Sequence, residues 1–166
     1  MLEKYITEST PLKLVTVRTS DKNGRTKECC DLFRRELDAL SEALGRNLCI
    51  ETEILVPPEE NEYKEKNVLK ELFACFEKES YVYMDLTYGT KLTSIEMFSS
   101  LYFAEIVEKC NIKSVVYGQS TFNGSSEGEL YDATRLYHTV RFLDAAAQMD
   151  RKCFENLIQQ MLTEYN

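Results

Sequence analysis

The residues whose types and spacing best suit chemistry stand together at positions 85–91, which read Asp-Leu-Thr-Tyr-Gly-Thr-Lys. The carboxylate at the start of this segment can accept hydrogen bonds from backbone amides and so fix a turn. The hydroxyl of Thr87 can donate to a phosphate oxygen or to a ribose hydroxyl, and Gly89 lets the backbone approach a ligand closely. A helix that begins near Thr90 adds unpaired amides with partial positive charge, and Lys91 adds a full positive charge. The segment therefore predicts a small anion-binding site.

The same residue types also fit a plain structural turn. Strand–loop–helix connections with Asp, Thr and Gly occur in any doubly wound protein, whether or not they bind a ligand. The helix that follows has two candidate starts, because Thr90 can act as its N-cap while Thr93 and Glu96 match a capping box. The residues of this segment by themselves leave both interpretations open.

Alternating strand-like and helix-like patterns surround this segment. Strands are predicted by β-branched runs and period-two apolar positions over residues 12–18, 48–56, 81–86 and 112–117. Helices are predicted by apolar positions at helical spacing over about 28–44, 68–76, 90–109, 132–148 and 150–162. Strands separated by helices imply crossover connections, and hence an α/β fold with a mainly parallel sheet and helices on both faces.

Ligands of such sheets bind beyond the carboxyl ends of the strands. That rule selects three segments, 18–24, 85–91 and 118–129, of which the last is rich in Ser, Asn and Gly after residue 118 and is predicted to be a loop. The candidate ligand-binding residues are Arg18, Thr19, Ser20, Asp85, Thr87, Tyr88, Gly89, Thr90, Lys91, Gly118 and Gln119. A solvated strand end is the alternative for the first three, and a flexible polar loop is the alternative after residue 118.

Composition narrows the class of protein. A chain of 166 residues is about one ordinary domain, and no apolar run approaches the ~20 residues that cross a bilayer, so we expect a cytoplasmic protein without membrane contact. The net charge of −8 disfavours long nucleic acid, whose binding depends on many lysine and arginine contacts. The six cysteines are scattered and His138 is the sole histidine, so neither a metal site nor a cofactor is expected.

The segment 85–91 resembles a motif of the CRISPR-associated Rossmann-fold (CARF) family. In that family a strand is followed by Asp or Asn, any residue, Ser or Thr, three more residues, and Lys or Arg; Asp85, Thr87 and Lys91 match those positions. One group of the family carries Asp-x-Thr-His-Gly, in which Tyr88 here replaces the histidine. The strand at 112–117 and the stretch 130–134 also look like family segments.

The resemblance implies a Rossmann-like three-layer sandwich, with residues 1–166 as a single domain and helices from about residue 132 at a homodimer interface. It further implies a sensor for cyclic tetra- or hexa-adenylate, the second messenger of type III CRISPR antiviral defence. The family's leading strand is expected to be missing. Arg135 and His138 have the wrong spacing for the ribonuclease motif often fused to the family, so no effector nuclease is expected.

Two other functions remain beside the sensor. The first is a metal-independent ring nuclease that cleaves the cyclic ligand slowly through its ribose 2′-hydroxyl, with Lys91 and Thr87 as the candidate catalytic residues that stabilise the phosphorane. The second is an unrelated Rossmann-like domain that binds another small ligand or a protein.

Overall fold

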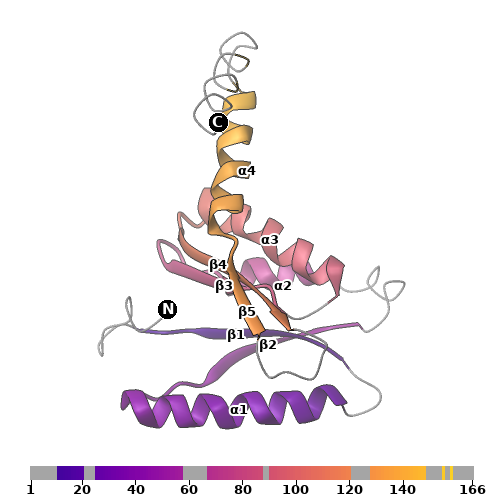
Figure 1. Ribbon diagram of the computed structural model, residues 1–166. Coiled ribbons are helices and arrows are strands. Elements are labelled where there is room, and N and C mark those ends of the chain that lie inside the picture. The colour runs from indigo at the N-terminus through magenta and orange to yellow at the C-terminus, as the bar shows by residue number, and fades with distance from the viewer. Residues whose placement is uncertain are drawn as a thin grey trace. The chain divides into compact units, whose positions relative to one another are not determined.

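The computed structural model describes residues 11–20, 25–57, 67–87, 90–120 and 128–148, together with residues 155 and 158. Figure 1 shows the order of the elements along the chain. The strands are β1 (Leu14–Thr19), β2 (Ile50–Val56), β3 (Tyr81–Asp85), β4 (Asn111–Ser120) and β5 (Gly128–Asp132). The helices are α1 (Arg25–Leu44), α2 (Val68–Cys75), α3 (Lys91–Ile106) and α4 (Thr134–Ala147). This alternation confirms the predicted α/β class.

The chain divides into two compact units. The first comprises residues 1–80 and 88–111, and the second comprises residues 81–87 and 112–166. The first unit holds the two-stranded sheet β1–β2 with helices α1 to α3, and the second holds the three-stranded sheet β3–β4–β5 with α4. Both sheets are small; the first is parallel, and the second is mixed because β5 pairs antiparallel with β4.

The core of the first unit lies where β2 meets α2. β1 and β2 are parallel neighbours, and the period-two pattern that predicted a half-buried second strand places Ile54 and Val56 on its covered face, at 1% and 0% exposure. Val68 and Leu72, one helical turn apart on α2, complete the cluster. Burying each of these side chains contributes about 1.5–3 kcal/mol relative to leaving it exposed.

The long helix α1 is covered less than its sequence predicts. Its end is as expected: the last helical residue is Leu44, and Gly45 follows with φ of +61°, a left-handed conformation that glycine adopts without strain. The predicted apolar stripe, however, leaves Phe33 at 45% and Leu40 at 41% exposure. The stripe has helical spacing, but the described residues bury only part of it.

β3 and β4 run parallel in the second unit. At their beginnings the amide of Asn111 donates to the carbonyl of Ser80 (2.8 Å), and at their ends the amide of Leu86 donates to the carbonyl of Val116 (2.8 Å). Both sequence positions increase from one bond to the other, which is the order that parallel neighbours give. The predicted crossover between these two strands is therefore present.

The segment 119–129, predicted to be a loop, is partly strand. β4 continues through Gly118, which was expected to end it, to Ser120, and β5 pairs with it antiparallel. Tyr117 and Tyr131 are directly opposite each other in this ladder. Such aromatic cross-strand pairs favour strand pairing, whereas the Ser, Asn and Gly residues nearby indicated only a loop.

α4 begins one residue later than expected. Ala133, not Asp132, is the residue before the helix. The carboxylate of Asp132 instead accepts from the amide of Thr134, the first helical residue (2.9 Å). The pKa of Asp132 is lowered mainly by hydrogen bonding to the Thr134 side chain, and further by the bond from the Thr134 amide. The helix predicted from about residue 150 lies outside the described residues, except that residues 155 and 158 are helical.

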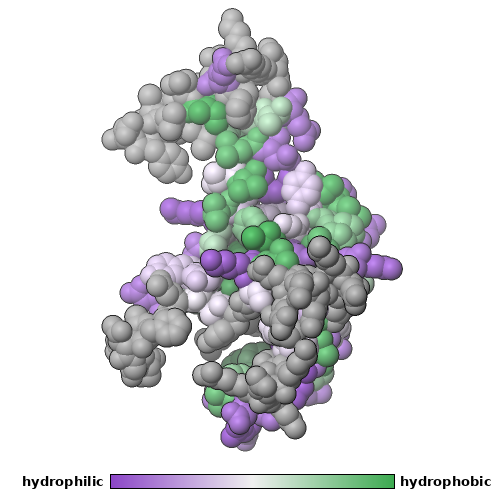
Figure 2. Space-filling model, turned by 90° about the vertical axis from the view of Figure 1, so that its right-hand side faces the viewer, coloured by the Kyte–Doolittle hydropathy of each residue, from purple (hydrophilic) through white to green (hydrophobic). Residues whose placement is uncertain are grey.

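One side of α4 is apolar and exposed. Leu136, Val140 and Leu143 follow one another at helical spacing and are 59%, 44% and 37% exposed. Figure 2 shows hydrophobic surface on the helix at the top of the view. None of the helices described is long and apolar enough to span a membrane.

Candidate functional site at the strand ends

Asp85 and Thr87 form a turn at the carboxyl end of β3. The amide of Thr87 donates to Asp85 Oδ1 (2.8 Å), and the Thr87 hydroxyl donates to the same oxygen. The first bond is the one that the sequence predicted for a carboxylate at this position. The Thr87 hydroxyl oxygen also accepts from the amide of Gly118 on β4 (2.8 Å). Two of the predicted ligand segments, one directly after β3 and one that begins within β4, are therefore joined through one threonine side chain.

Gly118 is needed where it stands because the Thr87 side chain occupies the space beside it. A Cβ atom built on Gly118 would lie 2.9 Å from both Cγ2 and Oγ1 of Thr87. That separation is shorter than two such atoms tolerate, so any larger residue would displace the threonine. Because Gly118 has no side chain, Thr87 can approach β4 at this position.

The start of α3 agrees with the first of the two predicted positions. Thr90 is the N-cap, and its hydroxyl oxygen accepts from the amide of Thr93 (3.2 Å). The alternative start at Thr93 is wrong: Thr93 lies inside the helix and is 2% exposed. Glu96 is half-buried, and desolvation raises the pKa of its carboxyl group.

Lys91 gives this helix end a net positive charge. It is the first residue of α3 and is exposed, and the first turn contains no acidic residue. The first amides of a helix have no partner within it, so they add partial positive charge at the same end. No described residue pairs with the Lys91 ammonium group. An anion is the ligand that this combination attracts.

Arg18, at the end of β1, is tied to its neighbour β2. Its Nε lies 2.8 Å from Glu53 Oε1, and its Nη2 donates to Glu53 Oε2 (3.0 Å). Arg34 of α1 approaches the same carboxylate at 3.5 Å. The hydrogen bond from Arg18 is the main cause that lowers the pKa of Glu53. The positive charge of Arg18 is therefore neutralised within the first unit.

The two polar residues after Arg18 continue along the edge of β2. Thr19 is the last residue of β1 and pairs with Val56, and the amide of Ser20 donates to the carbonyl of Val56 (2.7 Å). Both side chains are half-buried. Tyr88 and Gly89 lie outside the described residues, as does the side chain of Gln119.

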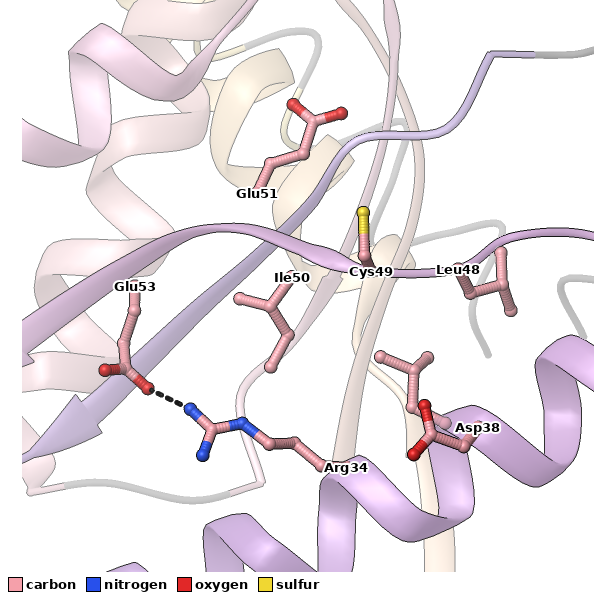
Figure 3. A pocket seen from close by; sticks show the side chains of 8 residues that line it. Arg34, Asp38, Leu48, Cys49, Ile50, Glu51 and Glu53 are labelled. Atoms are coloured by element: carbon pink, nitrogen blue, oxygen red, sulfur yellow. Dashed lines mark ion pairs between the residues drawn. The ribbon is translucent and has the colours of Figure 1, made fainter.

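A hollow of about 380 Å³ lies elsewhere in the first unit, between α1 and β2. In Figure 3, Ile50 points toward α1 while Cys49 and Glu51 point to the other side of the strand. The residues that line it are Arg34, Leu37, Asp38, Leu48, Cys49, Ile50, Glu51 and Glu53. The lining contains three carboxylates and one guanidinium, and that guanidinium is already paired with Glu53 (Figure 3). The lining therefore disfavours an anionic ligand, and it includes none of the predicted site residues.

The described cysteines differ in their burial. Cys110 is buried, while Cys29 and Cys49 are exposed, and all three are free thiols. Cys153 lies outside the described residues. Within the described ranges, no three His, Cys, Asp or Glu side chains gather as metal ligands would.

Glu53 is the site residue that sequence reasoning missed. In the parallel register, Glu53 lies opposite Thr16. Thr16 is two residues before Arg18, so the side chains of Glu53 and Arg18 lie on the same face of the sheet. Opposite charges at such positions signal an ion pair only once the register is known, and the sequence gives no register.

Comparison with models of protein families, with curated proteins and with solved structures finds no match to this chain.

Proposed function

We propose that this chain is a sensor domain that binds a cyclic oligoadenylate, either tetra- or hexa-adenylate, in type III CRISPR antiviral defence. The observation that carries the proposal is Lys91, an exposed lysine in the acid-free first turn of α3. Asp85 and Thr87 form a turn at the end of β3, and Lys91 follows them in the sequence at the spacing of the CARF motif. A phosphate of the ring is the ligand group that this lysine and the helix amides suit.

The proposal includes a Rossmann-like three-layer arrangement and a homodimer. The α/β alternation and the parallel pairs β1–β2 and β3–β4 support the first. The exposed apolar side of α4 supports the second, together with Phe142 at 38% exposure. A two-fold dimer offers identical half-sites to a ring with two-fold symmetry. Of the other apolar residues expected at this interface, Ile158 is helical and half-buried, whereas Phe154, Leu157 and Met161 lie outside the described residues.

Calorimetry with cyclic tetra-adenylate and cyclic hexa-adenylate tests the proposal, with linear oligoadenylate of matched length as the control. We expect one of the rings to bind with one ring per two chains, and the linear control to bind more weakly. The absence of binding to both rings at protein concentrations of tens of micromolar would overturn the proposal in favour of an unrelated ligand or protein partner.

Chromatography of the bound ring after several hours separates sensing from cleavage. A sensor leaves the ring intact. A ring nuclease converts it to linear products without added metal, with Lys91 stabilising the charge on the phosphorane.

A further inference from the structure

The outer edge of β5 is not paired by any described strand. β5 is the last strand in the order β3–β4–β5, and all five of its residues are exposed. An edge strand presents backbone amides and carbonyls that another chain can pair with, and many proteins block such an edge with lysine, proline or a bulge. β5 contains neither lysine nor proline, and its register with β4 has no bulge.

Alternate backbone groups of β5 point to this free edge. In an antiparallel ladder, pairs that exchange backbone hydrogen bonds alternate with pairs that do not. The amide of Ala133 donates to the carbonyl of Val115 (2.8 Å), one position beyond the last pair of the β4–β5 register. On β4, the carbonyl of Val116 and the amide of Gly118 bond instead to the two residues that follow β3. The β5 residues whose amides and carbonyls face outward are therefore Gly128, Leu130 and Asp132.

The outward positions are spaced so that β5 can pair with a second copy of itself. In a two-fold antiparallel pairing centred on Leu130, that residue lies opposite the partner's Leu130, and Gly128 lies opposite the partner's Asp132. All of these positions face outward, so every amide and carbonyl of the edge meets a partner. A two-fold contact between identical surfaces is also the commonest form of association between copies of one chain.

The side chains suit the same register. The two Leu130 side chains meet at the axis, where each is removed from water. Glu129 lies opposite the partner's Tyr131, and within one chain the Tyr131 hydroxyl already donates to Glu129. The second carboxylate of the strand, Asp132, lies opposite the partner's Gly128. Like charges directly opposite each other would oppose pairing, and this register contains none.

We propose that β5 is a dimer contact, at which two copies of this chain pair antiparallel about Leu130 and join their three-stranded sheets into one continuous sheet. The backbone hydrogen bonds of the edge hold the pair, and the position of Leu130 at the axis fixes its register. This inference goes beyond the proposed function, in which the dimer is supported by α4, and it does not depend on the ligand.

Sedimentation equilibrium of the full chain at tens of micromolar, without ligand, tests the contact. We expect the wild type to be a dimer. Leu130→Lys and Leu130→Glu each place two like charges opposite each other at the axis, so we expect each to raise the dimer dissociation constant by about tenfold or more. An equimolar mixture of the two variants places lysine opposite glutamate, and we expect it to form heterodimers.

Two further variants separate the backbone contact from a general effect of charge. Leu130→Pro removes an amide that faces the free edge and not β4, so we expect the dimer to dissociate while circular dichroism shows the fold retained. Leu32→Lys is the matched control, because Leu32 on α1 is 54% exposed and Leu130 is 59% exposed. We expect Leu32→Lys to leave the dimer unchanged.

Four outcomes would overturn the inference. A monomeric wild type would leave the edge to an extended segment of a different protein. If Leu136→Lys dissociates the dimer and the Leu130 variants do not, the contact lies on α4 alone. If the mixture of charge variants stays monomeric, the pairing is not centred on Leu130, and if Leu130→Pro stays dimeric, the backbone of β5 does not form the contact. Calorimetry with the cyclic rings decides the proposed function separately.

Discussion

Polar residues and one basic residue stand near the ends of both β1 and β3, but the two basic residues differ in whether a carboxylate pairs with them. At the end of β1, Arg18 is held by Glu53 on the adjacent strand, and Arg34 approaches the same carboxylate. After β3, Lys91 is exposed at the start of α3, and no described residue pairs with it. A basic residue near the carboxyl end of a strand is therefore weak support for a ligand site until its partners are known.

The polar neighbours of the two basic residues differ in the same way. Ser20 extends the backbone pairing of the strand through its amide bond to Val56. Thr90 caps a helix, and the first turn of a helix carries partial positive charge. One strand end is satisfied by the sheet itself, whereas the other is followed by an exposed lysine that no described residue pairs.

The largest expected effect is that of Lys91→Ala on ligand affinity. A charge-assisted contact to phosphate contributes about 1.5–3 kcal/mol, so we expect calorimetry to show cyclic oligoadenylate binding weakened by about tenfold or more. Lys70→Ala is the matched control, since it removes the same charge from an exposed position on α2. Equal affinity of Lys91→Ala and wild type would mean that 85–91 is a structural turn.

Thr90→Ala is expected to lower the free energy of unfolding by about 1 kcal/mol, the usual effect of losing an N-cap. Urea denaturation measures this loss, and Thr90→Ser, which keeps the capping oxygen, is the comparison. If alanine and serine at this position give the same midpoint, the bond to the amide of Thr93 does not stabilise α3, and the contrast between the two strand ends loses one of its supports.

Arg18→Ala is expected to affect mainly stability, whereas Lys91→Ala is expected to affect mainly ligand affinity. Arg18→Ala should reduce the free energy of unfolding by up to about 1 kcal/mol, because a partly exposed ion pair is lost, and change ligand affinity less than Lys91→Ala does. Calorimetry and urea denaturation of the same preparation check both parts. A larger loss of affinity than in Lys91→Ala would place the ligand at the end of β1 instead.

Acid should weaken the stabilisation that Glu53 provides. Its folded pKa is lowered below the ordinary value of 4.5, mainly by the hydrogen bond from Arg18. Its contribution is therefore complete above that ordinary value and is lost as the pH falls through the folded pKa. We expect the difference in urea midpoint between wild type and Glu53→Gln to be present at pH 7 and to shrink toward pH 3. A difference that stays constant over this range would mean that the carboxylate is not coupled to Arg18.

Local patterns in the sequence were sufficient for most of the elements and for one helix terminus. The period-two positions predicted β2 with its buried Ile54 and Val56, and the helical spacing of apolar residues predicted that α1 ends at about residue 44, because these signals act over a few neighbouring residues. The same kind of signal failed at β5, where Ser, Asn and Gly indicated a loop. Whether Tyr131 lies opposite Tyr117 depends on a pairing between two segments, which no local pattern encodes.

At the candidate site, too, contacts between near neighbours in the sequence were predictable, and contacts between distant residues were not. The sequence by itself indicated that Asp85 can accept from a backbone amide of the turn that follows it. It also left Thr90 as one of two candidate helix caps, because both contacts span two or three residues. Only the tertiary structure decided that Glu53 neutralises Arg18 and that the Thr87 hydroxyl is bonded to Gly118. Those partners are more than 30 residues apart in the sequence, and their contact depends on the register between strands, which is set by the packing of the whole sheet.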